Sequence, residues 1–585
     1  MSTIDFQTKY ETTKNESIHI HQRCNVLAMM RFLLFSLMII FLLLGYFWIN
    51  GCYVLSGISL VLFVIIVKKH SDYKKQDIYI QALLQTYFKH LQRQKDEWKD
   101  FLECGDEFLE EHDYKSLDLD ILGKNSLYQM ICVAFTSKGK KQLAKDLILD
   151  QTYENMKKRQ KAVQELANMP EFVVQLETSG LLIPHQKKNG IDHWLESLQT
   201  LSITSISPLI FILPVVICLS LLGVCFHWFM PYSQVILEIG VVFQLCLAFL
   251  FYGKHQKIFE PISYLSTGLE SYAHSYAQIV NNSFTSDYLK NLQQQLIKQE
   301  DVVLAIRQLS RISQKVIYRH NIFAFIVLNG LGLFDFYIHF QYAHWLKQYQ
   351  EIVPEWFDVL AKFESLMSLS VLKIDQFDVV LPHIQDQKVL DFEDLRHPLI
   401  APQQVVGNDF SMNEPLCVIT GSNMSGKTTF MRSIGLNLVL AYAGGFVFAK
   451  SMTCTPMHIM TSMRIKDNVE EGVSTFYGEL LRIKAMITFS KNHQPMICLI
   501  DEIFKGTNSL DRIAGAKATI EKLSLPYAYT FLTTHDLELG QLKKQNYHFD
   551  EYYQDEHIYF DYKIKKGISQ SSNGQFLLKQ VGIID

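Results

Sequence analysis

The sequence predicts a multidomain protein with α-helical transmembrane hairpins, an all-α central region and a C-terminal α/β domain. Three observations lead to this fold class. Four apolar runs approach the length of a bilayer-crossing helix. Long stretches between and after them have apolar residues at helical spacing. From about residue 386, short β-like runs alternate with helices. A chain of 585 residues is long enough for several such domains.

The apolar runs form two pairs, 32–49 with 52–67 and 205–226 with 233–252. A charged residue at the centre of a membrane helix costs about 2.5–3.5 kcal/mol on insertion scales. The first three runs avoid such residues, and the fourth has only Glu238, near its start. The runs therefore favour membrane spans, and four buried core helices are the alternative. A cleaved signal peptide fits poorly, because the first run begins too far into the chain and is too long.

Lysine and arginine flank both pairs and are absent from the turns at 50–52 and 227–232. The flanking residues are Arg23, Arg31, Lys68, Lys69, Lys187, Lys188, Lys254 and Lys257. By the positive-inside rule, both hairpins have cytoplasmic ends. This predicts a multi-pass protein of the cytoplasmic membrane with its C-terminal domain in the cytoplasm. A further apolar run, 322–340, contains Asn329 and Asp335, and we expect it to be a buried helix of the cytoplasmic part.

These patterns define the expected domains. We expect a cytoplasmic segment over 1–30, a first hairpin over 31–69, a helical juxtamembrane segment over 70–116, a helical core over 117–204 and 254–385, a second hairpin over 205–253 and an α/β domain over 386–585. Residues 291–316 read as one long amphipathic helix without Gly or Pro.

Composition excludes some functions. Lys and Arg total 55 against 59 Asp and Glu, so the chain has no global basic footprint for nucleic acid. Two basic segments, 138–141 and 157–161, could contact phosphate, although a solvated helix face explains them more simply. The ten cysteines have no metal-site spacing and indicate reduced or buried thiols.

A strand-like run, 415–420, leads directly into a glycine-rich stretch that fits G-x-x-x-x-G-K-[ST]. The stretch consists of Gly421, Ser422, Asn423, Met424, Ser425, Gly426, Lys427 and Thr428, and Thr429 follows it. Such a loop curls backbone N–H groups around phosphates, and the helix expected over 428–441 directs its positive end at them. Lys427 would reach the outer phosphates and Thr428 would bind Mg²⁺. The expected cofactors are therefore ATP and Mg²⁺.

Two later strands end in residues suited to phosphate chemistry. The strand 496–500 leads into Asp501, expected to hold Mg²⁺, and Glu502, expected to orient the attacking water. The strand 529–534 leads into His535, expected to sense the γ-phosphate. With Lys427, Glu502 and His535 form the expected catalytic set. The simpler alternatives are an ordinary pair of strand-end carboxylates and a surface histidine.

The C-terminal third resembles the ATPase domain of the MutS family, a branch of the ABC-type ATPases. The resembling blocks occur in family order: 395–400, 407–409, 419–435, 441–449, 472–480, 499–512, 533–542 and 560–583. The resemblance implies a P-loop ATPase that forms a homodimer with composite ATP sites. Ser474 matches the signature serine that reaches across the dimer, and Asp511 matches an acid at that interface. By the same resemblance Asn423 contacts phosphate and His397 stacks on adenine.

The resemblance continues more weakly over 117–372, which is similar to the MutS helical core and levers. We expect no N-terminal mismatch-reading or connector domain and no C-terminal helix-turn-helix tail, which puts mismatch recognition in doubt. One hypothesis is a membrane-anchored ATPase that drives a clamp on double-stranded DNA, as in mismatch repair. The other is an ATP-driven conformational device that acts on membrane or protein partners. Transport is a poorer third, because the apolar runs have almost no polar lining.

Overall fold

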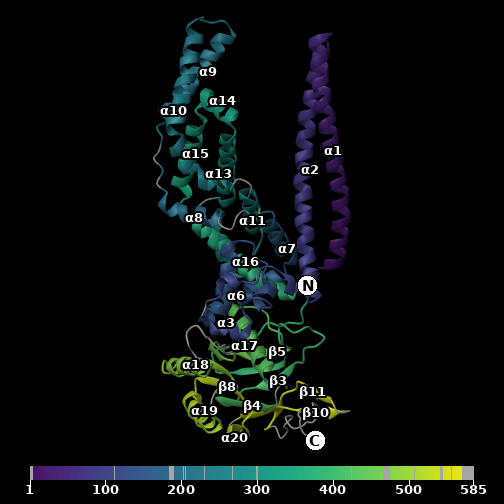
Figure 1. The fold of residues 1–585 in the computed structure, drawn as a ribbon, viewed down its shortest axis with the longest axis vertical. Helices are drawn as coiled ribbons and strands as arrows, with labels where there is room; N and C mark the ends of the chain where they lie inside the picture. Colours follow the sequence, from purple (N-terminus) through teal and green to yellow (C-terminus); the bar gives the residue numbers. More distant parts are fainter. Residues whose placement is uncertain are drawn as a thin grey trace.

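The computed structural model describes residues 4–568 except for 50, 111, 184–189, 202, 204–205, 230, 266–267, 298–300, 423, 465–474, 506–507, 541–544 and 555–556. The molecule is elongated (Figure 1). Two groups of helices extend from one end, a helical region occupies the middle, and an α/β domain forms the other end.

The first helical group is an antiparallel hairpin of α1 (Phe6–Phe47) and α2 (Cys52–Gln94). The Asp5 side chain accepts the free N–H groups at the start of α1 and so fixes where the helix begins. Small residues lie between the helices: Ser56 Oγ donates to the Met38 carbonyl at 3.1 Å, and Gly45 contacts the Tyr53 ring. The large apolar side chains of the outer half point away from the hairpin and are exposed.

The second hairpin consists of η3 (Pro208–Phe211), α9 (Ile212–Cys225) and α10 (Tyr232–Ser263). Close approach again occurs at small residues, since Gly223 faces Ser233 and Gly240 faces Ile217. In the described part of the chain, four helices are long and apolar enough to cross a membrane, and they are those of the two hairpins.

The helical region is built around α16 (Val353–Ile374), whose long buried face packs on α5 and α6. Glu364 on α16 accepts the N–H groups of Phe135 and Thr136, each at 2.9 Å, and so fixes the start of α5. The other helices of this region are η1 (Trp98–Asp100), η2 (Asp106–Phe108), α3 (Tyr114–Leu119), α4 (Leu127–Ile131), α5 (Ser137–Ile148), α6 (Tyr153–Ala167), α7 (Pro170–Leu181), α8 (Gly190–Thr200), α11 (Leu269–Asn281), α12 (Asp287–Ile297), α13 (Val302–Ile317), η4 (Tyr318–His320), α14 (Ile322–Gly332) and α15 (Phe334–Tyr349).

The expectation of one long helix over 291–316 is wrong. The structure has α12 and α13 there, with residues 298–300 outside the described part. Asp301 begins α13, because its carboxylate accepts the N–H groups of Val303 at 3.0 Å and Leu304 at 3.1 Å. An N-cap aspartate can start a new helix without a glycine or proline to end the previous one.

The expectation of a buried helix over 322–340 is also wrong. At Leu333, with a φ of 46°, α14 ends and the chain bends by 80° into α15. The buried residues of α14 are Phe325, Asn329 and Gly330. Phe323 is 78% exposed and Val327 is 55% exposed. The apolar composition predicts burial inside the protein, but the protein covers only one side of α14.

The α/β domain contains a six-stranded sheet in the order β12-β9-β4-β8-β7-β6, parallel except for β12. A four-stranded sheet, β1-β5-β2-β3, and a two-stranded ribbon, β10-β11, flank it. The elements are β1 (His383–Ile384), β2 (Leu390–Leu395), β3 (Asn408–Ser411), β4 (Leu416–Gly421), α17 (Lys427–Ala443), β5 (Ser451–Cys454), β6 (His458–Ser462), α18 (Thr475–Ser490), β7 (Met496–Asp501), α19 (Ser509–Leu523), β8 (Ala528–Thr534), α20 (Leu537–Gly540), β9 (Gln545–Phe549), β10 (Glu551–Gln554), β11 (His557–Phe560) and β12 (Lys565–Lys566).

Strands β4, β7 and β8 are central and fully buried, which matches their continuous apolar sequences. Because they are parallel neighbours, their carboxyl ends meet at one edge of the sheet. Ligands of open α/β sheets bind outside this edge.

Candidate functional site

The glycine-rich loop connects β4 to α17 at the carboxyl edge of the sheet. Gly421 and Gly426 have φ values of 148° and 109°, which side chains rarely adopt. A Cβ on Gly421 would lie 2.8 Å from the Phe549 carbonyl oxygen. The loop can therefore turn tightly only with glycine, and it delivers the N-terminus of α17 to the site. Asn423 lies outside the described residues, and Met424 is exposed.

The Lys427 ammonium is held inside the loop. Its Nζ donates to the carbonyl oxygens of Gly421 at 2.9 Å and Ser422 at 2.7 Å. Burial lowers the pKa of Lys427, because the low-dielectric surroundings disfavour the charge. The Ser425 hydroxyl is buried and has no hydrogen-bond partner within the described parts of the chain. A buried cation beside an unsatisfied donor is suited to an anion such as phosphate.

Asp501 and Thr428 meet where β7 ends and α17 begins. The Thr428 hydroxyl donates to Asp501 Oδ2 at 2.7 Å, and the Thr533 hydroxyl from β8 donates to Asp501 Oδ1. These are hard oxygen donors of the kind that Mg²⁺ prefers. No group of three or more His, Cys, Asp or Glu with metal-site geometry occurs among the described residues. A Mg²⁺ ion here would therefore take its remaining ligands from phosphate and water, which is its usual behaviour.

Glu502 lies next to Asp501, and its carboxylate contacts two nitrogen-bearing side chains. His535 Nε2 lies 2.5 Å from Glu502 Oε1, and Lys505 Nζ lies 2.9 Å from Oε2. The hydrogen bond from His535 is the main reason that the pKa of Glu502 falls to about 2. Its backbone N–H is also fixed, by the Thr533 hydroxyl at 2.9 Å. The carboxylate is therefore ionised and oriented at the edge of the sheet.

A cavity of about 590 Å³ opens over the loop and is lined by Lys427, Thr428, Glu502 and His397. Burial lowers the pKa of His397 to about 4, so the ring is neutral, and its Nδ1 accepts the Leu399 N–H at 3.2 Å. The cavity wall also includes residues that the sequence did not single out: Ile400, Gln404, Val405, Val406, Phe549 and Tyr562. In the sequence, only the resembling blocks at 395–400, 407–409 and 560–583 contain or adjoin some of these residues.

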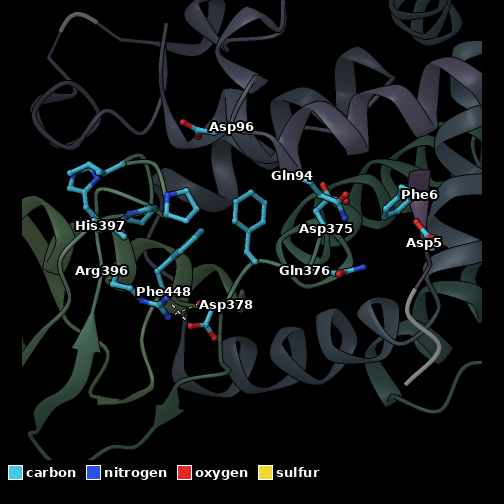
Figure 2. A pocket seen from close by; sticks show the side chains of 15 residues that line it. Asp5, Phe6, Gln94, Asp96, Asp375, Gln376, Asp378, Arg396, His397 and Phe448 are labelled. Carbon is cyan, nitrogen blue, oxygen red and sulfur yellow. Dashed lines mark hydrogen bonds and ion pairs between the residues drawn. The ribbon is translucent and has the colours of Figure 1, made fainter. Parts of the chain in front are cut away.

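A second cavity, of about 630 Å³, adjoins the first, and His397, Ile400 and Val405 line both. Figure 2 shows that its opposite wall comes from the base of the first hairpin, where Asp5 and Phe6 lie. The second cavity thus connects the cavity over the glycine-rich loop to the start of α1.

Of the two remaining expected residues, Asp511 is described and does not line the cavity. Ser474 lies outside the described residues, directly before α18. Asp511 is exposed at the start of α19, where its N–H donates to Asn508 Oδ1 at 2.9 Å. Glu479 on α18 accepts the backbone N–H of Phe504 and so ties α18 to the segment after Glu502.

A buried ionic joint connects the α/β domain to the helical region. The Asp118 carboxylate, at the end of α3, accepts the N–H groups of Met463 and Arg464 at 3.0 Å each. It also pairs with Arg482 of α18 at 2.9 Å. The neighbouring Asp120 pairs with Arg432 of α17. These contacts tie α17 and α18 to α3 and the residue that follows it.

Fold and site define a largely helical protein with a C-terminal α/β domain, in which a glycine-rich loop and Glu502 line one cavity and Asp501 contacts Thr428 of that loop. The family described as MutS domain V matches residues 417–583. The DNA mismatch repair protein MutS of Aquifex pyrophilus is 31% identical over 236 residues, or 38% of this chain. The C-terminal part of the chain is thus similar to the MutS family. The match spans 27% of that relative's length.

Proposed function

We propose that the protein binds and hydrolyses ATP with Mg²⁺ in the cavity over the glycine-rich loop, as a P-loop ATPase of the ABC type. The observation that carries the proposal is the convergence of two contacts, Thr428 with Asp501 and Glu502 with His535, at the loop that holds Lys427. Members of the MutS family are ATPases, which supports the same activity.

Each residue has a role that follows from its position. Lys427 would exchange its two carbonyl partners for phosphate oxygens, and the N-terminus of α17 would bind the same anion. Thr428 and Asp501 would hold Mg²⁺, which supplies charge neutralisation when bound. Glu502 would accept a proton from the attacking water, and His535 would keep Glu502 ionised and in place.

Two substitutions separate binding from hydrolysis. Lys427→Ala removes the cationic partner of the phosphates and should abolish nucleotide binding. Glu502→Gln should bind ATP but hydrolyse it at least about 10²-fold more slowly, because general bases contribute about that much. Lys517→Ala and Glu521→Gln, at exposed positions of α19, are the matched controls and should behave as wild type. Wild-type turnover in Glu502→Gln would refute the assignment of the base.

The ATPase cycle is proposed to move the helical region with respect to a membrane. The apolar hairpins α1–α2 and α9–α10 would anchor the protein in the cytoplasmic membrane, with both termini in the cytoplasm. Single cysteines near Gly51 and Pro231 should react with an impermeant thiol reagent in intact cells, and one at Lys517 should not. Labelling at Lys517 from outside would refute this topology.

Double-stranded DNA is the first candidate for the partner, because the relative from Aquifex pyrophilus is a DNA mismatch repair protein. The basic segments give it little support. Lys138 pairs with Asp358 at 2.6 Å, and the buried Arg159 pairs with Asp146 at 2.8 Å. These ion pairs favour the second candidate, a conformational device for membrane or protein partners.

DNA binding by the detergent-solubilised protein, measured over a salt series, distinguishes the two candidates. A clamp on DNA should lose affinity steeply and linearly in a plot of log affinity against log salt, because phosphate contacts release counterions. Absence of binding at low salt, with and without ATP, would rule out the DNA role and leave the second candidate.

A further inference from the structure

We propose that α14 is a re-entrant membrane segment that enters the bilayer beside α10, ends near its middle and returns through α15, with lipid acyl chains on its outer face. The proposal rests on the proposed membrane anchoring, because it takes α10 as a span. It adds an element that enters the membrane and leaves it on the same side.

The depth of α14 follows from its contacts with α10. Just before α14, Arg319 Nη1 donates to Gln256 Oε1 at 3.1 Å. Within it, the Phe325 ring lies 5.6 Å from the Tyr252 ring. Near its end, a Cβ on Gly330 would lie 3.4 Å from Val241. From Tyr252 to Val241, α10 rises about 16 Å at about 1.5 Å per residue. This is roughly half of a hydrocarbon core about 30 Å thick.

The chain returns to the side from which it came. After the bend at Leu333, the Phe340 ring on α15 lies 5.7 Å from Phe211, at the start of the second hairpin. Further along α15, Trp345 Nε1 donates to the Ala305 carbonyl of α13 at 2.9 Å. Figure 1 shows α14 beside α10, with α15 leading back toward the helical region. Both ends of the bent pair therefore lie on one side.

The polar groups at the bend are satisfied inside the protein. Asn329 Oδ1 accepts the Asp335 N–H at 2.9 Å, and Asn329 Nδ2 donates to the Phe325 carbonyl at 3.1 Å. The Asp335 carboxylate is fully buried and accepts Arg319 Nε at 2.8 Å. Non-helical backbone is tolerated at membrane depth only where protein or water satisfies it. The bend meets this requirement.

Lipid is the occupant that fits the outer face. Five large apolar side chains of α14 are exposed: Ile322, Phe323, Ile326, Val327 and Leu331. No charged residue occurs from 322 to 334. This face continues the exposed apolar surface of α10, to which Val242 and Phe249 belong. An apolar surface continuous with a membrane span, at the same depth, is suited to acyl chains rather than to water.

The test uses an encoded fluorescent amino acid at Val327 in the full-length protein in liposomes, which leaves the native cysteines untouched. Val64 on α2 is the lipid-facing reference and Leu304 on α13 the aqueous one, since both are exposed in the structure. Lipids brominated along the acyl chain and iodide in solution are the two quenchers. Bromolipid should quench Val327 as strongly as Val64, and iodide should quench only Leu304. Phe323 is the alternative position if the Val327 variant does not fold.

The other outcomes overturn the proposal in distinguishable ways. Iodide quenching at Val327 together with bromolipid quenching at Val64 would place α14 in water and leave the hairpin anchor intact. Iodide quenching at Val64 as well would refute the membrane anchoring itself. Protection of Val327 from both quenchers would indicate cover by protein, such as a second copy.

A separate experiment distinguishes the re-entrant segment from a complete fifth crossing. A cysteine at His344, exposed on α15, should react with an impermeant thiol reagent only after the cells are permeabilised. Reaction in intact cells would show that the chain crosses the bilayer, and would overturn the re-entrant assignment.

Discussion

His90 should make the base of the first hairpin sensitive to alkaline pH. The ring is completely buried on α2, far beyond the apolar run 52–67. Its Nδ1 lies 2.5 Å from Asp375 at the end of α16, and its Nε2 lies 3.2 Å from Glu177 on α7. Phe6 from the start of α1 stacks on the ring at 4.5 Å. One imidazolium thus joins four helices.

Burial on its own lowers the pKa of His90, but the carboxylates of Asp375 and Glu177 outweigh it and raise the pKa from 6.5 to about 9. This increase in the pKa corresponds to roughly 3 kcal/mol of stability of the folded state. Because the folded-state pKa is raised, this stability is fully present below pH 6.5. It decreases between pH 6.5 and 9, and is lost above that range.

The measurement is the apparent free energy of unfolding by urea in detergent, from pH 6 to pH 10. The wild type should lose about 3 kcal/mol more across this range than His90→Gln, whose side chain does not titrate. His274→Gln, at an exposed position on α11, is the control and should follow the wild type. If the free energies of unfolding of wild type and His90→Gln change with pH in parallel, His90 is not charged in the folded protein and does not form ion pairs with Asp375 and Glu177.

Three further results are expected. Asp118→Ala leaves the buried Arg482 without its carboxylate and should lower the free energy of unfolding by about 3–5 kcal/mol, measured in the same urea assay. Gly426→Ala forces a side chain into a backbone conformation that costs about 1–2 kcal/mol, and should weaken nucleotide binding in a titration with a fluorescent ATP analogue. Ser474→Arg and Lys427→Ala should each abolish ATPase activity, and mixing the two should restore part of it if the sites are shared between chains. If no activity returns, the number of ATP molecules bound per mixed dimer distinguishes the two explanations. One ATP per dimer would show a shared intact site that cannot act alone, and any other number would indicate that the sites are not shared.

The contacts of the candidate site were foreseeable because they depend on short segments with strict geometry. When two strands of one parallel sheet end in a glycine-rich loop and in two acids, the loop and the acids lie at the same edge of the sheet. The structure brings Thr428 to Asp501 and His535 to Glu502 accordingly. Their roles in ATP hydrolysis remain proposals.

The rest of the cavity could not be foreseen from local patterns. Val405 and Tyr562 lie far apart in the sequence, and tertiary contacts bring their segments to one wall, such as the 3.0 Å hydrogen bond that Asn408 Nδ2 donates to the Tyr562 carbonyl. The break at Leu333 has the same origin. It depends on a partner for Asn329 six residues away, and composition carries no sign of that contact.

The length of α1 has a mechanical consequence. Its 42 residues form one uninterrupted rod of about 63 Å, at about 1.5 Å per residue. The end of the rod that carries Phe6 lines the second cavity, which adjoins the one over the glycine-rich loop, and the apolar run begins some 40 Å away. A tilt of only about 5° at the base would displace the tip by about 5 Å over such a rod. A tilt of α1 that begins at the cavity beside His397 would therefore reach its far end as a shift comparable to the rise of a full helical turn.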